Sequence, residues 1–192
     1  EDVAVFSILK TFFKALHSVS GSFVDPMMSR FLELKNNVKD FSVKMNAIFF
    51  STFFLRLLLF TVVSLLAQYF FSIYKIESSE INYLIFYILG LEYVIAGMIL
   101  SYGIILRLDK TTNRVLISSI VRFIVEITLI YLILLDYGII AAALILLVAR
   151  YVETVSTYLF ISKQRIFYLS GLILFSFIFP IIYFLFKLLI VF

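Results

Sequence analysis

The chain alternates between long apolar stretches and short polar connections. Six apolar stretches can be separated, at residues 3–33, 46–72, 81–106, 115–135, 138–161 and 167–192. A helix rises about 1.5 Å per residue, so about 20 apolar residues cross a hydrocarbon core that is about 30 Å thick. The runs are continuous rather than alternating, which favours transmembrane helices over barrel strands. The pattern therefore predicts an all-α polytopic bundle of about six transmembrane helices.

The first stretch is the least apolar of the six. Lys10, Lys14 and His17 follow a spacing of four and then three residues, which places them on one face of a helix. Such a face is compatible with a membrane helix that is kinked near Gly21–Pro26, because proline removes a backbone donor and clashes with the preceding turn. The alternative is an amphipathic helix that lies on the membrane surface.

Lysine and arginine are concentrated on alternate connections. Those at 30–44, 107–114 and 162–165 contain four, three and two of these residues, whereas the turn around Lys75 contains one and the turn at 136–137 contains none. Cytoplasmic connections carry such an excess of positive charge. The bias predicts a multi-pass protein of the inner (cell) membrane in which the connections at 30–44, 107–114 and 162–165 are cytoplasmic.

The composition excludes most soluble classes of protein. Hydrophobic residues make up 64% of the 192 residues and charged residues 15%, whereas a soluble domain has about 25% charged residues. The net charge of +4 follows from the uneven connections, so nucleic-acid binding is not needed to explain it. The chain has no cysteine and one histidine, which leaves no thiolate or histidine cluster for a metal. No catalytic motif is present, and neither an enzyme nor a cofactor is expected.

Ionisable residues lie within the predicted spans. Such groups are costly in hydrocarbon and normally face the interior of the bundle or a wet cavity. Five are basic and three are acidic: Lys10, Lys14, Arg56, Arg122 and Arg150 against Glu92, Glu126 and Glu153.

Two interpretations of these charges stay open. Arg122 and Glu126 are four residues apart, and Arg150 and Glu153 are three apart, so each pair can form an ion pair within one helix. Complete pairing would make the charges structural. The excess of bases instead predicts a cationic cavity for a phosphate- or carboxylate-bearing solute, since arginine and lysine both bind such anions.

Small residues mark the predicted helix at 81–106. Gly90, Gly97 and Gly103 are spaced along it, together with Ala96 and Ser101. Small residues allow the backbones of neighbouring helices to approach closely. Close packing against another helix is therefore expected here.

Several short segments resemble a known family. The segment Asp2–Ser7 opens a helix that ends in Phe23–Arg30, around Pro26. A turn at Leu106–Asn113 and a second at Asp136–Ala142 follow in order. This order is similar to that of polysaccharide flippases, the O-antigen and teichoic-acid exporters of the multidrug/oligosaccharidyl-lipid/polysaccharide exporter superfamily. The chain departs from the pattern in the first turn, which lacks the usual glycine, and at Ala141, which stands where glycine is usual.

The resemblance implies the second lobe of a MATE-like flippase. Residues 1–161 would be the helices of a C-terminal lobe that lacks its first helix, and residues 162–192 an additional transmembrane helix. Such a protein works by alternating access with an N-terminal lobe of the same protein, and it moves undecaprenyl-pyrophosphate-linked oligosaccharide from the cytoplasmic to the external leaflet. The five bases would then bind substrate, with the three acids as their intramembrane partners. The alternatives are a lobe of a cation-coupled multidrug antiporter and a non-transporting membrane scaffold or polymerase subunit.

Overall fold

A computed structural model describes residues 2–23, 38–108, 111–161 and 173–191 of the chain. Within these ranges all regular secondary structure is helical. The elements are α1 (Asp2–Ser22), α3 (Val38–Leu65), α4 (Ala67–Ile73), α5 (Glu80–Leu108), α6 (Thr112–Leu129), the π-helix η1 (Ile130–Leu134), α7 (Leu135–Ile161) and α9 (Ile178–Val191).

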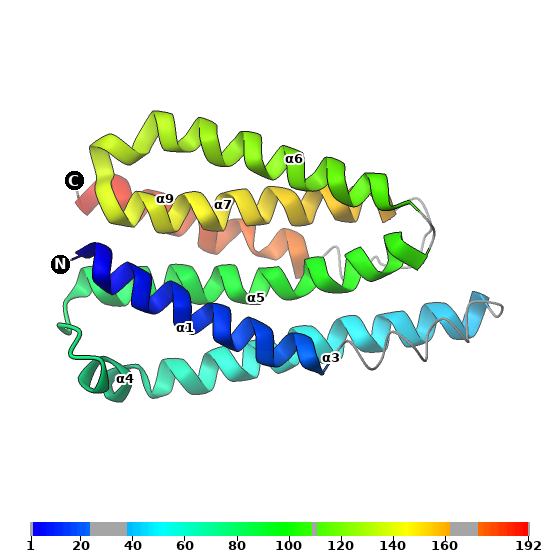
Figure 1. The fold of residues 1–192 in the computed structure, drawn as a ribbon, viewed down its shortest axis with the longest axis horizontal. Helices are drawn as coiled ribbons and strands as arrows, with labels where there is room; N and C mark the ends of the chain where they lie inside the picture. Colours follow the sequence, from blue (N-terminus) through cyan, green and yellow to red (C-terminus); the bar gives the residue numbers. More distant parts are fainter. Residues whose placement is uncertain (1, 24–37, 109–110, 162–172, 192) are drawn as a thin grey trace.

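The long helices lie side by side in one elongated bundle (Figure 1). Four of them are each long and apolar enough to cross a membrane: Val3–Phe23, Glu80–Gly103, Thr112–Leu134 and Gly138–Ile161. The bent pair Phe49–Leu65 and Ala67–Ile73, in α3 and α4, makes a fifth where the two are counted as one span. Of the sixth predicted span, the structure describes a shorter apolar helix at Ile173–Phe184. The prediction of an all-helical, multi-pass bundle is therefore confirmed, with four or five spans in the described part of the chain.

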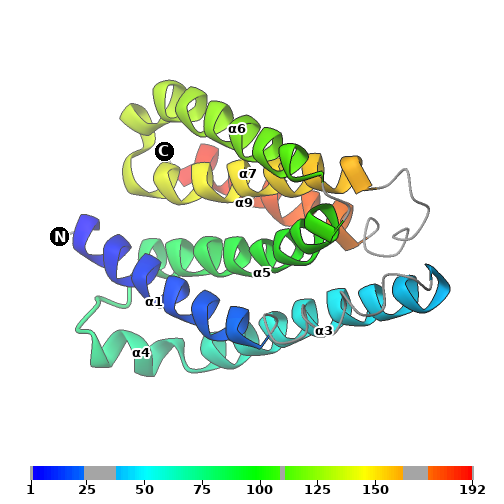
Figure 2. The same cartoon turned by 45° about the vertical axis from the view of Figure 1, so that its right-hand side comes forward.

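The direction of the helices agrees with the alternation of charge. α1, α5 and α7 run one way along the bundle, and α3, α6 and α9 run the other way (Figures 1 and 2). Arg114, in the first turn of α6, thus lies at the end of the bundle where α5 ends. The connection between α4 and α5 lies at the opposite end, and it contains Lys75 together with Glu77. Most of the three basic connections falls outside the described residues.

Helix α5 forms the centre of the bundle. In its most apolar segment 67% of the residues are buried, compared with 6% in α6. Ile88, Val94 and Met98 are fully enclosed. α1, α3 and α7 pack around α5. A helix that is apolar on all sides is well suited to this position.

Two of the three glycines expected to allow close packing do so. A Cβ atom on Gly90 would overlap the Phe60 ring of α3, and one on Gly97 would overlap the side chain of Arg56. Gly103 has open space at the same position. The contact between α3 and α5 therefore depends on Gly90 and Gly97.

The apolar stretch predicted at 46–72 is divided into two helices by a bend. α3 and α4 meet at Leu66 with a bend of 64°, although neither proline nor glycine is present there. Beyond the bend, Phe70 and Phe71 are buried, and the Phe71 ring lies 4.7 Å from that of Tyr83 and 5.8 Å from that of Phe86. Packing of these rings against the start of α5 explains why the chain turns aside. The kink predicted near Pro26 lies outside the described residues.

The hairpin between α6 and α7 contains a glycine in an unusual conformation. Gly138 has φ 58° and ψ −135°, in the region where only glycine is unstrained. The Cβ position of Gly138 meets no other group within 4 Å. Gly138 therefore serves the reversal of the chain and not helix packing.

Candidate functional site

A cavity of about 300 Å³ opens between α1, α5, α6 and α7. The lining residues lie near the middle of these helices rather than at their ends. Most of the polar lining is ionisable, namely Lys10, Lys14, His17, Glu92, Arg122, Glu126 and Arg150. Four of the five bases predicted from the sequence thus line one cavity, together with two of the three acids.

Both arginines of the cavity are held by carboxylates. Arg150 donates from Nε to Glu92 at 2.7 Å and from a terminal nitrogen to Glu153 at 2.8 Å. Arg122 lies 3.4 Å from Glu153 and 3.7 Å from Glu126. Positive and negative groups therefore alternate from α5 through α7 to α6.

Glu153 is the centre of this chain of ion pairs. Its side chain is 8% exposed, and its two oxygens accept from Arg150, Arg122 and the hydroxyl of Ser119 at 3.1 Å. The two intrahelical pairs that the spacing allowed are thus present. The pairs Arg150–Glu92 and Arg122–Glu153 join different helices, and no spacing along the sequence could have indicated them.

Lys10 and Lys14 have no carboxylate partner among the described residues. Both are exposed, both line the cavity, and both lie on the face of α1 that the sequence predicted. The Lys10 ammonium lies 5.8 Å from the centre of the Phe6 ring, the outer range of a cation–π contact. The cavity therefore contains two ammonium groups that are available to an anion.

Arg56 does not line the cavity, contrary to the sequence-based expectation. Only 1% of this residue is exposed. Its guanidinium donates to the backbone oxygen of Tyr93 at 3.0 Å and lies 5.0 Å from the centre of the Tyr93 ring. It also contacts Nδ1 of His17 at 3.1 Å. Gly97 has no side chain and so leaves room on α5 for the long side chain of Arg56. Arg56 is therefore enclosed between helices and is not positioned to contact a solute in the cavity.

His17 belongs to the site, although the sequence did not identify it as a candidate. It is half-buried, lines the cavity and contacts Arg56 behind it. The signal was available in its spacing, which places it on the same face as Lys10 and Lys14. A lone histidine in an apolar helix does not by itself indicate a site.

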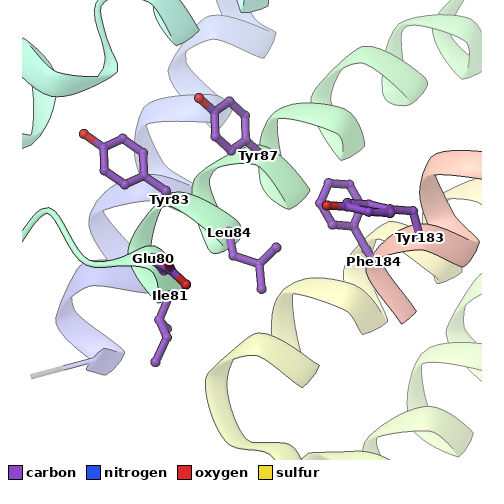
Figure 3. Close-up of a pocket in the computed structure, with 7 residues that line it drawn as sticks. All are labelled: Glu80, Ile81, Tyr83, Leu84, Tyr87, Tyr183 and Phe184. Carbon is purple, nitrogen blue, oxygen red and sulfur yellow. The ribbon is translucent and has the colours of Figure 1, made fainter. Parts of the chain in front are cut away.

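A second cavity, of about 450 Å³, lies between the start of α5 and α9. Figure 3 shows Tyr83 and Tyr87 on α5 and Tyr183 and Phe184 on α9, with Glu80 as the one charged side chain among the labelled residues. Tyrosine is typical of the interface between membrane and water. This cavity contains none of the predicted site residues, and its composition is that of a helix end at the membrane surface.

Comparisons with protein-family models, with curated proteins and with solved structures found no match to this chain. The resemblance to polysaccharide flippases stays a prediction. We therefore infer the class of solute from the charged side chains that line the cavity.

Proposed function

We propose that this protein is one lobe of an alternating-access membrane transporter for an anionic, lipid-linked oligosaccharide. In this proposal a polyprenyl-pyrophosphate-linked glycan crosses from the cytoplasmic to the external leaflet, and an N-terminal lobe completes the pathway. In this proposal the end of the bundle where α5 ends is the cytoplasmic end, because Arg107 and Arg114 lie there.

One observation carries the proposal. The cavity lies near the middle of the long helices, and Lys10 and Lys14 reach it without a carboxylate partner among the described residues. Unpaired ammonium groups in a region of low dielectric attract anions strongly. A pyrophosphate group carries the charge and the acceptor oxygens that such a pair can bind.

The acidic side chains disfavour the multidrug antiporter. That function needs carboxylates that are free to bind a cation, yet Glu92 accepts from Arg150 at 2.7 Å and Glu126 lies 3.7 Å from Arg122. The available charges in the cavity are positive. A purely structural scaffold would not explain why Lys10 and Lys14 face a cavity instead of carboxylates.

Binding to the purified chain in lipid nanodiscs tests the class of ligand. We expect farnesyl pyrophosphate, a short lipid with the same headgroup, to bind and farnesol not to bind. An organic cation that binds while farnesyl pyrophosphate does not would favour the antiporter. Absence of binding by both would favour the scaffold.

Replacing Lys14 by alanine should weaken farnesyl pyrophosphate binding by about 10- to 150-fold, because a charge-assisted contact contributes about 1.5–3 kcal/mol. Lys14→Arg should retain part of the affinity, since the charge remains. Lys75→Ala, in the exposed turn between α4 and α5, is the matched control and should bind normally.

The same variants can be measured in cells that depend on the protein for surface glycan. The amount of glycan exported per inserted protein should fall in Lys14→Ala and not in Lys75→Ala. Equal export by both variants would remove Lys14 from the proposed site.

A further inference from the structure

The contact between His17 and Arg56 joins α1 to α3 behind the cavity. A terminal nitrogen of Arg56 lies 3.1 Å from Nδ1 of His17, and the same nitrogen donates to the backbone oxygen of Tyr93 at 3.0 Å. Arg56 is enclosed, whereas His17 also lines the cavity. The His17 imidazole therefore lies between the cavity on one side and the enclosed guanidinium of Arg56 on the other.

This geometry determines where the imidazole proton is. A guanidinium has donors only, so Nδ1 of His17 must be the acceptor. The imidazole is then neutral, and its single N–H is on Nε2. A proton on Nδ1 would place two donors and two positive charges against each other, so protonation of His17 and the contact with Arg56 exclude each other.

The other charges near the cavity act in the same direction. Cations are contributed by four of the five helices around the cavity and Arg56: Lys10 and Lys14 on α1, Arg56 on α3, Arg122 on α6 and Arg150 on α7. The carboxylates are Glu92 on α5 and Glu126 on α6, with Glu153 on α7 behind Arg150, and the phenol of Tyr93 is on α5. The charges around the cavity are therefore five cations against three carboxylates, and this surplus of positive charge disfavours a further proton on His17 while the cavity holds no anion.

We propose that His17 is a proton-binding site that couples proton uptake to anion binding in this cavity. An anion held by Lys10 and Lys14 offsets the surplus positive charge, and His17 then accepts a proton on Nδ1 from the bulk solution, which reaches it through the cavity, as its contact with Arg56 opens. By linkage the proton strengthens anion binding as much as the anion strengthens proton binding. The proposal rests on the proposed function and adds a proton that binds together with the anion.

Opening the contact also has a mechanical consequence. The Arg56 side chain of α3 keeps its hydrogen bond to the Tyr93 backbone of α5. The hydrogen bond that joins His17 of α1 to Arg56 of α3 is lost. α1 carries both Lys10 and Lys14, so its position determines the shape of the cavity. Proton binding at His17 therefore acts on the helix that holds the anion.

The decisive variant is His17→Asn. The asparagine oxygen can accept from Arg56 as Nδ1 does, but the side chain cannot take up a proton. Farnesyl pyrophosphate binding is measured in nanodiscs between about pH 8 and about pH 6, the range in which histidine commonly titrates. The ionisation of the probe itself is common to both proteins, so the difference between them isolates His17.

In the wild type, affinity should rise by up to about tenfold more per pH unit lowered than in His17→Asn, which is the effect of one coupled proton. The same dependence on pH in both proteins would overturn the coupling while leaving the proposed function in place. A wild type that binds no probe at any pH would overturn the proposed function itself.

A second measurement does not depend on affinity. His17 is the only histidine of the chain, so ¹⁵N-histidine labelling gives one imidazole, whose nitrogen signals report its tautomer and proton directly. Without anion, Nδ1 should stay unprotonated as the pH is lowered from about 8 to about 6, and with farnesyl pyrophosphate present it should become protonated within this range. In Arg56→Gln, which keeps a donor but removes the charge, Nδ1 should gain its proton without the anion at a pH where the wild type stays neutral. A protonated Nδ1 in the anion-free wild type at about pH 8 would contradict the coupling alone.

Discussion

Replacing Glu153 by glutamine should lower the stability of the bundle by about 3 kcal/mol. Glu153 is nearly enclosed and accepts from Arg122, Arg150 and Ser119. Removing one charge of a buried ion pair leaves its partner uncompensated, which costs about 3–5 kcal/mol. The remaining pair between Arg150 and Glu92 places the expected loss at the lower end of this range.

Glu126→Gln is the matched control for this prediction. The Glu126 side chain is 27% exposed, and its contact with Arg122 is 3.7 Å, so its loss should cost less than about 1 kcal/mol. Titration with SDS, followed by circular dichroism of the protein in detergent, gives both values. A similar loss of stability in the two variants would show that Glu153 has no special place in the network.

Replacing Gly97 by alanine should destabilise the contact between α3 and α5 by about 1–3 kcal/mol, the usual cost of overpacking. The new methyl group would overlap the stem of Arg56. Arg56 would have to move, and its hydrogen bonds to His17 and Tyr93 would lengthen or break. The imidazole signal of His17 should therefore change together with the denaturation midpoint.

Gly103→Ala separates this steric effect from helix propensity. Gly103 lies on the same helix, and a methyl group there would meet nothing within 4 Å. Alanine is favoured over glycine in a helix by about 1 kcal/mol, so this variant should be neutral or slightly more stable. Loss of stability in Gly103→Ala equal to that in Gly97→Ala would contradict the assigned role of Gly97.

The sequence predicted those features of the fold that follow from hydropathy and charge. Continuous apolar runs identified the helices, and the alternation of lysine and arginine agreed with the direction in which they run. Charges three or four residues apart predicted the pairs Arg122–Glu126 and Arg150–Glu153, because both partners lie on one helix. Each of these features depends on residues that are close together in the sequence, so the pattern of a short segment is enough to predict it.

Features that depend on contacts between helices could not be predicted in this way. Nothing in the sequence around Leu66 indicates the 64° bend, because the cause is the packing of Phe70 and Phe71 on α5. Arg56 and His17 are 39 residues apart, so their contact is invisible in either helix alone. Arg56 does not line the cavity, although the sequence had predicted that it would. A base without a carboxylate partner can be accommodated in a span by a backbone carbonyl and an aromatic ring, and it does not then need contact with water.

The low burial of α6 has a consequence for how that helix is set in the bilayer. Hydrocarbon tails are as apolar as leucine, so the apolar side chains of α6 gain little by facing the bundle instead of lipid, and its polar side chains set its rotation about its own axis. Ser119 and Arg122 both reach Glu153, and these two side chains are three residues apart on one face. The two polar contacts therefore fix the rotation of α6 about its own axis, and this rotation determines the direction in which Glu126 points.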